Sequence, residues 1–179
     1  MQIYTFGNGE AQGRAHMKET LGGKGANLAE MCRLGLPVPP GFTLPTEACH
    51  SGFQNGALTE ELDTLLTQGL SHIEQMLDRK FGEPTKPLLL SVRSGAPVSM
   101  PGMMDTILNL GLNDEVAAQL AQETQNERFV YDAYRRLLQM YGDVVLGVRP
   151  ENVLAEDPFE HCLEQKKEAY DVVEDIDLP

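Results

Sequence analysis

The chain has 179 residues, with 14 Lys and Arg against 27 Asp and Glu, and therefore a formal net charge of −13 at pH 7. This length is enough for one compact domain, or for one domain with a helical addition. The acidic excess argues against nucleic acid and against a membrane surface as partners, because both are anionic, although a few well-placed cations can still hold a small anion.

Cysteine content and hydropathy indicate where the protein functions. No apolar run approaches the roughly 18 residues of a membrane-spanning helix, and the N-terminal residues lack a secretory signal pattern. The three cysteines, Cys32, Cys49 and Cys162, form no CxxC pair, and their odd number is typical of a reducing compartment. We therefore expect a cytoplasmic protein in which each cysteine is a small buried apolar residue.

The first elements along the chain are a short strand and a helix. Residues 2–6 (QIYTF) are rich in strand-forming side chains and favour a strand. A glycine-rich segment then leads into a helix predicted from Lys24 to Leu34, with Gly35 in the position of a C-terminal glycine. The prolines that follow exclude a helix, and residues 41–44 favour a second short strand.

The middle of the chain predicts two more helices and two more strands. Thr46 is a candidate N-cap for a short helix, and Thr59 begins a longer helix that runs toward Phe81. Residues 88–92 (LLLSV) have apolar side chains on both faces, which is typical of a central strand. Residues 106–110 (TILNL) favour another strand, so the segment between them is a loop that joins two strands.

The sequence after Gly111 is helical. Asn113 or Asp114 caps one helix, residues 127–148 form a strongly amphipathic second helix, and a third helix precedes an acidic end. The predicted fold class is therefore α+β. Residues 1–111 are expected to form a small mixed sheet with flanking helices, and residues 112–179 a helical subdomain.

The loop after residues 88–92 has a composition that suits phosphate binding. Arg93 ends the predicted strand, and the following glycines and serines leave backbone N–H groups accessible to a ligand. Methionines beside them would form an adaptable apolar cover. The loop residues are Ser99, Met100, Pro101, Gly102, Met103 and Met104. Taken alone, these residues favour a plain strand-to-strand turn over a phosphate site.

A second candidate anion site lies at the predicted start of the first helix. Lys24 stands between Gly23 and Gly25, where free backbone N–H groups and the helix dipole favour an anion. The segment is not a Walker motif, because Lys18 occupies the first glycine position and Gly25 follows the lysine. A loop–helix junction with an exposed lysine explains these residues equally well.

Four stretches, taken together, resemble the N-terminal part of the pyruvate, phosphate dikinase family in the same order. They are LGGKGANLAEM (21–31), LGLPVPPGFTLPTEAC (34–49), LLLSVRSGAPVSMPGMMDTILNLGLND (88–114) and FVYDAYRRLLQMYGDVV (129–145). The third stretch is long and specific. The resemblance covers nearly the whole chain to about Val145 and is looser beyond it.

The resemblance implies a partial ATP-grasp domain, in which two α/β portions close over ATP and Mg²⁺. The family converts ATP, phosphate and pyruvate to AMP, pyrophosphate and phosphoenolpyruvate, or the reverse. Its GGKG lysine and SVRS arginine contact the nucleotide phosphates, which carries over to Lys24 and Arg93. The methionine-containing loop at 99–104 carries over as a cover on the triphosphate. The resemblance therefore makes Lys24 and Arg93 the candidate catalytic and ATP-binding cations.

Other parts of the family pattern are missing. The Mg²⁺-binding carboxylates of the family lie in a later portion, and the phosphohistidine and pyruvate-binding parts have no match. The histidines, namely His16, His50, His72 and His161, are better interpreted as structural or surface residues. We therefore expect a piece of a longer phosphotransferase whose partners are ATP, phosphate and the remainder of the dikinase. By itself it should bind nucleotide without completing the reaction.

Two alternatives belong to other functional classes. The chain could be a non-catalytic nucleotide-binding or protein-interaction module, with Tyr131, Tyr134 and Tyr141 near Arg135 and Arg136 as a contact surface. Core packing beside a solvated charged face is the plainer explanation of that cluster. A homo-oligomer formed through exposed apolar surface of the helical part is the other alternative.

Overall fold

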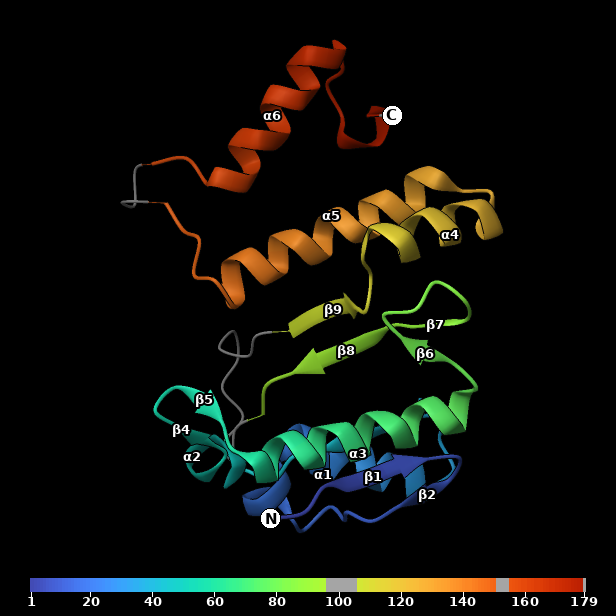
Figure 1. Cartoon of the computed structure of the whole chain (residues 1–179), viewed down its shortest axis with the longest axis vertical. Helices are drawn as coiled ribbons and strands as arrows, with labels where there is room; N and C mark the ends of the chain where they lie inside the picture. Colours follow the sequence, from blue (N-terminus) through green and yellow to red (C-terminus); the bar gives the residue numbers. More distant parts are fainter. Residues whose placement is uncertain (96–105, 151–154, 179) are drawn as a thin grey trace. The chain divides into compact units, whose positions relative to one another are not determined.

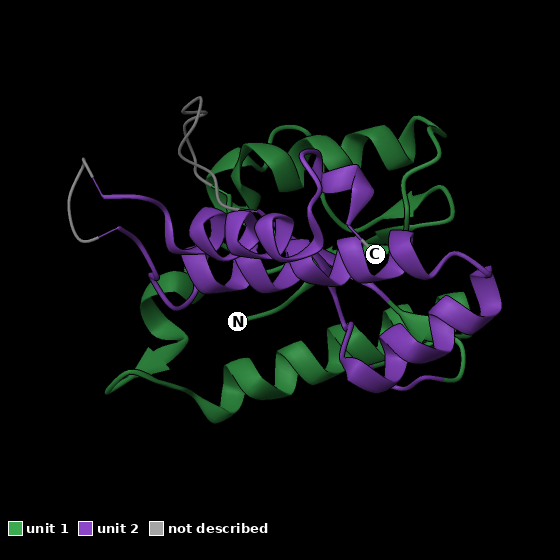
Figure 2. Cartoon of the chain, turned by 90° about the horizontal axis from the view of Figure 1, so that it is seen from above, with its two compact units in different colours: residues 1–81, 85–88, 93–105 green, residues 82–84, 89–92, 106–179 purple. Residues whose placement is uncertain are grey.

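A computed structural model describes residues 1–95, 106–150 and 155–178 of the chain (Figure 1). The chain divides into two compact units, coloured in Figure 2. The first comprises Met1–Phe81, Thr85–Leu88 and Arg93–Asp105, and the second comprises Gly82–Pro84, Leu89–Val92 and Thr106–Pro179. Helices and small sheets occur together, which confirms the α+β class. The domains predicted as 1–111 and 112–179 stay a prediction.

The first unit contains a three-stranded antiparallel sheet. Its strands are β1 (Tyr4–Gly7), β2 (Glu10–Ala11) and β3 (Gly41–Thr43), in the order β2-β1-β3. Asn8 and Gly9 form the turn between β1 and β2 with φ values of 51° and 83°. Two-residue hairpin turns of type I′ need positive φ at both positions, which Asn-Gly adopts readily. Both predicted strands of this sheet are confirmed.

Two helices of this unit pack closely on β3. Helix α1 spans Lys18–Arg33 and helix α3 spans Glu60–Leu77. A Cβ atom added to Gly69 of α3 would lie 2.6 Å from Cε1 of Phe42, so only glycine allows this approach. The predicted N-cap of α3 is confirmed, because the Thr59 hydroxyl accepts the Leu62 N–H at 3.3 Å. The helix ends before the predicted Phe81.

The remaining elements of the first unit are short. They are α2 (Ala48–Ser51), the antiparallel pair β4 (Phe53–Gln54) and β5 (Ala57–Leu58), and the parallel pair β6 (Lys80–Phe81) and β7 (Pro87–Leu88). Leu88 in β7 is buried with 2% of its surface exposed.

The apolar run at 88–92 does not form one central strand, and that prediction is wrong. Leu88 belongs to β7, and the next strand, β8 (Leu90–Arg93), pairs with β9 (Thr106–Leu110) in a separate two-stranded sheet. Val92 is 46% exposed. The apolar run is therefore divided between two small sheets. The strand predicted at 106–110 is confirmed as β9.

The second unit is built around α4 (Asp114–Thr124) and α5 (Glu127–Val144), which pack against each other and whose core includes Leu112, Val116 and Leu137. Asn113 caps α4 by accepting the Val116 N–H at 2.8 Å, which confirms the predicted start of this helix. Val116 is fully buried. The amphipathic pattern at 127–148 corresponds to α5.

Helix α6 (Pro158–Tyr170) and the short helix η1 (Asp175–Asp177) complete the second unit. Asp157 caps α6 by accepting the Phe159 N–H at 2.8 Å, and α6 contains no buried residue. A Cβ atom added to Gly142 of α5 would lie 2.4 Å from Cζ of Phe159, so the phenyl ring rests directly on the α5 backbone.

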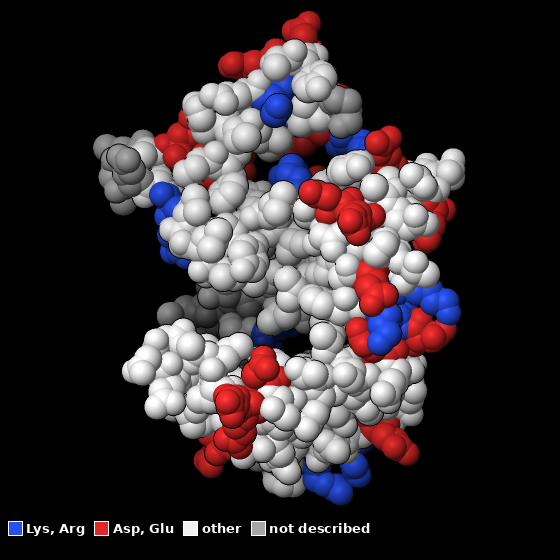
Figure 3. Space-filling model, viewed as in Figure 1, with Lys and Arg blue, Asp and Glu red and all other residues white. Residues whose placement is uncertain are grey.

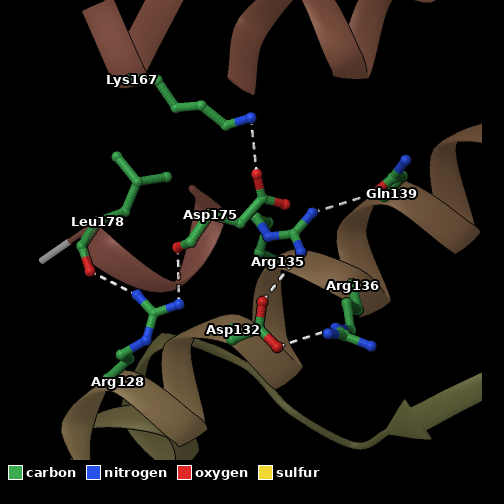
Figure 4. Close-up of polar contacts among 8 residues, drawn as sticks. All are labelled: Arg128, Asp132, Arg135, Arg136, Gln139, Lys167, Asp175 and Leu178. Carbon is green, nitrogen blue, oxygen red and sulfur yellow. Dashed lines mark hydrogen bonds and ion pairs between the residues drawn. The ribbon is translucent and has the colours of Figure 1, made fainter. Parts of the chain in front are cut away.

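Charged side chains attach the C-terminal turn to α5 and α6 (Figure 4). The Arg128 guanidinium donates to the carbonyl of Leu178 and to that of Asp175, the latter at 2.6 Å. The Lys167 ammonium lies 2.8 Å from the Asp175 carboxylate and 2.7 Å from that of Glu164. Polar contacts, with the ring of Phe159, therefore hold this end of the unit.

The titration of Asp175 offers a direct check of this attachment. The hydrogen bond from Lys167 holds the pKa of Asp175 below its ordinary value, although burial opposes this. The stability that this carboxylate contributes is therefore present above the unfolded pKa of about 3.9, and it is lost as pH falls through the lower folded pKa. Lys167→Met is expected to raise the Asp175 midpoint in a carboxyl ¹³C NMR titration. The neighbouring Lys166→Met variant should leave it unchanged; equal effects of both would contradict the assignment.

The cysteines differ from their prediction. Cys32 is buried, and its thiol donates to the Glu10 carbonyl at 3.2 Å, but Cys49 and Cys162 are exposed. The predicted burial is therefore confirmed for Cys32 and wrong for Cys49 and Cys162. None of the helices in the described ranges is long and apolar enough to cross a membrane.

Candidate functional site

Helix α1 is interrupted at Gly22. The φ and ψ of this residue are 67° and 166°, values that L-residues with a side chain rarely adopt. One helical turn precedes Gly22, and a second helical segment follows it. Helix α1 begins at Lys18, so the helix start predicted at Lys24 is wrong for α1 as a whole. The second helical segment, however, has its N-terminus directly before Lys24.

A further glycine of this segment is needed for packing. A Cβ atom added to Gly25 would lie 2.7 Å from Cγ2 of Thr43, closer than real Cβ contacts. Gly25 therefore brings the second segment of α1 against β3. Gly25, one of the two glycines that suggested an anion site, thus has a structural role in packing, and Gly22 has one at the N-terminus of the helical segment.

Thr46 contacts the interruption from outside the helix. Its N–H donates to the carbonyl of Thr20 at 2.7 Å, and its hydroxyl donates to the carbonyl of Glu19 at 2.7 Å. The predicted role of Thr46 as an N-cap is wrong, since α2 begins after Glu47 without a side-chain cap. The sequence held no local signal for this contact, because the hydroxyl and its acceptor are 27 residues apart.

The two predicted cations stand close to this region along the chain. Lys24 is half-buried in α1, and Arg93 is exposed at the end of β8. Within residues 1–95, 106–150 and 155–178, neither side chain forms a hydrogen bond or ion pair with a protein group. Both positive charges are therefore available to an anion.

The backbone after Arg93 approaches the interruption of α1 within the first unit. A Cβ atom added to Gly95 would lie 3.9 Å from the Leu21 carbonyl oxygen and 4.0 Å from Cα of Gly22. The structure therefore brings together the two glycine-containing segments that carry Lys24 and Arg93. The predicted cover of this site lies outside the described residues; it comprises Ser99, Met100, Pro101, Gly102, Met103 and Met104.

The surrounding charge makes local cations important. Figure 3 shows acidic side chains at several places on the face in view, with basic ones among them rather than in one patch. With a net charge of −13, the protein repels anions at long range. An anionic ligand would therefore depend on short-range contacts with individual cations and backbone N–H groups.

Residues 18–76 match the family model described as the pyruvate phosphate dikinase AMP/ATP-binding domain. The chain is 51% identical over 98% of its length to a pyruvate, phosphate dikinase of Rhizobium meliloti (strain 1021), and covers 19% of that protein. It is 51% identical to a chloroplastic pyruvate, phosphate dikinase of Flaveria trinervia and 52% identical to one of Zea mays, covering 18% of each.

The chain thus spans about a fifth of the length of the curated relatives that it matches. The family-model match contains the interruption of α1, Lys24 and Thr46, and the similarity to the relatives extends over nearly the whole sequence. Residues 18–76 are therefore similar to pyruvate phosphate dikinase AMP/ATP-binding domains.

Proposed function

We propose that this chain binds the phosphates of ATP at the interruption of α1, with Lys24 and Arg93 as the cationic contacts. The observation that carries the proposal is the helical N-terminus created at Gly22, inside a segment that matches an AMP/ATP-binding domain. The approach of Gly95 to this N-terminus supports the participation of Arg93.

The chemistry of the segment suits a polyphosphate. The first N–H groups of a helix have no intrahelical acceptor, and the helix dipole adds about half a positive charge there. Lys24 supplies a compact charge beside these N–H groups, and Arg93 supplies a planar group that can donate two parallel hydrogen bonds to phosphate oxygens. Positioning and charge neutralisation are most of what phosphoryl transfer requires of a protein.

The finer assignment follows the relatives. We propose that the chain serves as part of an ATP-grasp nucleotide-binding domain in a phosphotransferase that converts ATP, phosphate and pyruvate to AMP, pyrophosphate and phosphoenolpyruvate. ATP, phosphate and the rest of such a dikinase are then its partners. The loop at 99–104 is proposed to cover the triphosphate, and the protein is proposed to be cytoplasmic, although the plant relatives are named as chloroplastic.

Mg²⁺ is implied by the resemblance but finds no site among the described residues. Residues 1–95, 106–150 and 155–178 include no group of three or more His, Cys, Asp or Glu side chains that could hold a metal ion. The contacts that we propose for the phosphates are the cations Lys24 and Arg93 and backbone N–H groups.

The double variant Lys24→Ala, Arg93→Ala tests the proposal. Hydrogen bonds to charged groups contribute about 1.5–3 kcal/mol each, so the loss of both cations should weaken ATP binding by about 100-fold or more. The measurement is a titration of the ¹⁵N-labelled chain with ATP, followed through the amide signals of Gly23, Lys24 and Gly25.

Lys18→Ala is the matched control for this variant. It removes the same kind of charge from the exposed first turn of α1, before the interruption. Its expected effect on ATP affinity is less than about threefold, because an exposed charge outside the site is screened by solvent. Equal affinities of the double variant and the Lys18→Ala control would disprove the proposed site.

An alternative is a protein contact through the outer face of α5. Tyr131, Leu138 and Tyr141 are 43%, 56% and 41% exposed on this helix, while Tyr134 is held by a 2.9 Å hydrogen bond to Asp114. These exposed apolar groups favour a protein-interaction module or a homo-oligomer as the second candidate. It stays secondary, because residues 18–76 match a nucleotide-binding family.

A further inference from the structure

Thr46 occupies two acceptors that a continuous α1 would use itself. In an α-helix each N–H donates to the carbonyl four residues earlier. The carbonyls of Glu19 and Thr20 would then pair with the N–H groups of Gly23 and Lys24. Instead, the Thr46 hydroxyl donates to Glu19 and the Thr46 N–H donates to Thr20, each at 2.7 Å.

The backbone conformation of Gly22 explains why the carbonyls of Glu19 and Thr20 accept from Thr46 and not from α1 itself. With φ of 67° and ψ of 166°, Gly22 redirects the chain between the first turn of α1 and its second segment. The carbonyls at the end of the first turn therefore accept hydrogen bonds from outside α1 and not from the N–H groups that follow Gly22. Thr46 supplies both donors from a single residue.

The position of Thr46 is itself fixed. It follows β3 closely, and β3 is held against the second segment of α1 by the contact between Thr43 and Gly25. On its other side, the Cys49 N–H donates to the Thr46 carbonyl at 3.2 Å at the start of α2. The same stretch of chain therefore contacts α1 before and after the interruption.

We propose that Thr46 is a positioning residue for the phosphate site. By donating hydrogen bonds to the carbonyls of Glu19 and Thr20, Thr46 stabilises the interruption of α1. The N–H groups of Gly23 and Lys24 therefore stay available to phosphate oxygens. This inference rests on the proposed function. Backbone N–H groups that Thr46 positions would then recognise the polyphosphate part of the ligand.

The proposal distinguishes the polyphosphate from the rest of the nucleotide. Backbone N–H groups at a helical N-terminus recognise phosphate oxygens and carry no information about the base. Any change at Thr46 should therefore alter the affinities for ATP and for inorganic tripolyphosphate by the same factor. Contacts of the adenine ring should keep their contribution to ATP binding.

The variants Thr46→Val and Thr46→Ser separate the hydroxyl from the shape of the side chain. Valine keeps the β-branched shape and the backbone N–H but removes the donor to Glu19, whereas serine keeps the donor. A hydrogen bond contributes about 0.5–1.5 kcal/mol, so Thr46→Val should weaken binding of ATP and of tripolyphosphate by about threefold to tenfold. Thr46→Ser should bind both ligands with the wild-type affinity within about twofold. Both are measured by amide titration of the 179-residue chain.

Amide hydrogen exchange without ligand distinguishes positioning from a purely structural role. In Thr46→Val the unsatisfied Glu19 carbonyl should attract the Gly23 N–H, so exchange at Gly23 should become slower. A variant that merely loses stability would show faster exchange at Gly23 and throughout the first unit. Slower exchange at Gly23 with weaker tripolyphosphate binding supports the inference, and faster exchange there overturns it.

The Lys24→Ala variant separates failure of this inference from failure of the proposed function. If the wild-type chain shows no amide shifts with ATP or tripolyphosphate, or if Lys24→Ala binds as tightly as wild type, the proposed function fails and the inference fails with it. If Lys24→Ala weakens binding but Thr46→Val binds as wild type does, only the role of Thr46 is disproved.

Discussion

Replacing Gly22 by valine is expected to remove nucleotide binding and to lower the free energy of unfolding by about 1–3 kcal/mol. Gly22 has a φ of 67° and a ψ of 166°, a region that a β-branched residue does not adopt without strain. The variant would relieve that strain by moving the backbone toward the helical region, which eliminates the helical N-terminus before Lys24. Urea unfolding and ATP titration measure the two effects.

Gly23→Ala is the control for this prediction. Gly23 lies in the same motif, but it is not among the positive-φ glycines of the described residues. Alanine at a helical position reduces the entropy of the unfolded chain, so this variant should be as stable as wild type or about 0.4–1 kcal/mol more stable. If Gly22→Val were as stable as Gly23→Ala, the interruption of α1 would not depend on the glycine.

Leu137→Ala is expected to destabilise the chain by about 2–5 kcal/mol, the largest effect on stability that we anticipate. Leu137 is 5% exposed and packs with Leu112 and Val116 in the core of the second unit. Removing its side chain leaves a cavity that β9 and α4 cannot fill without moving. The measurement is the urea midpoint of unfolding, followed by far-ultraviolet circular dichroism.

The adjacent leucine provides the matched control. Leu138 is 56% exposed on the same helix, so Leu138→Ala removes the same atoms from a position that is already largely in water. Its expected effect is within about 0.5 kcal/mol. Equal losses from the two variants would mean that the packing of α5 on Leu112 and Val116 is wrongly assigned.

The elements with strong local signals could be predicted from the sequence. Thr59 and Asn113 were recognisable as N-caps because the capping side chain and its N–H partner lie three residues apart. The amphipathic pattern of α5 and the strand formers of β1 and β9 were equally local. These predictions depended only on residues that are neighbours in sequence.

Features that depend on tertiary contacts could not be predicted. The apolar run at 88–92 has the composition of a central strand, but its residues pair with different partners in two small sheets. The exposure of Cys49 and Cys162 depends on which helix faces pack, which composition does not specify.

For the candidate site, Lys24 and Arg93 were predicted as phosphate contacts through the resemblance to the dikinase family, because their glycine-rich surroundings alone suit a plain turn or an exposed lysine equally well or better; this assignment stays a prediction. The sequence did not reveal the helical turn at 18–21 that precedes Gly22, because the Gly22-Gly23 pair is a turn signal and placed the predicted helix start at Lys24. Nor did it reveal Thr46, whose partners are distant in sequence and are backbone carbonyls of no particular residue type.

The absence of buried side chains in α6 has a thermodynamic consequence. A helix that separates from its neighbours without exposing much apolar surface does so with little change in heat capacity, because that change scales with the hydration of apolar groups. Although the Phe159 ring of α6 contacts α5, α6 has no fully buried side chain, so its detachment should depend less on temperature than the unfolding of the core does. It should depend more on ionic strength, which screens the ion pair between Lys167 and Asp175. Within the second unit, α6 is therefore the helix whose attachment we expect the salt content of the solvent to control most directly.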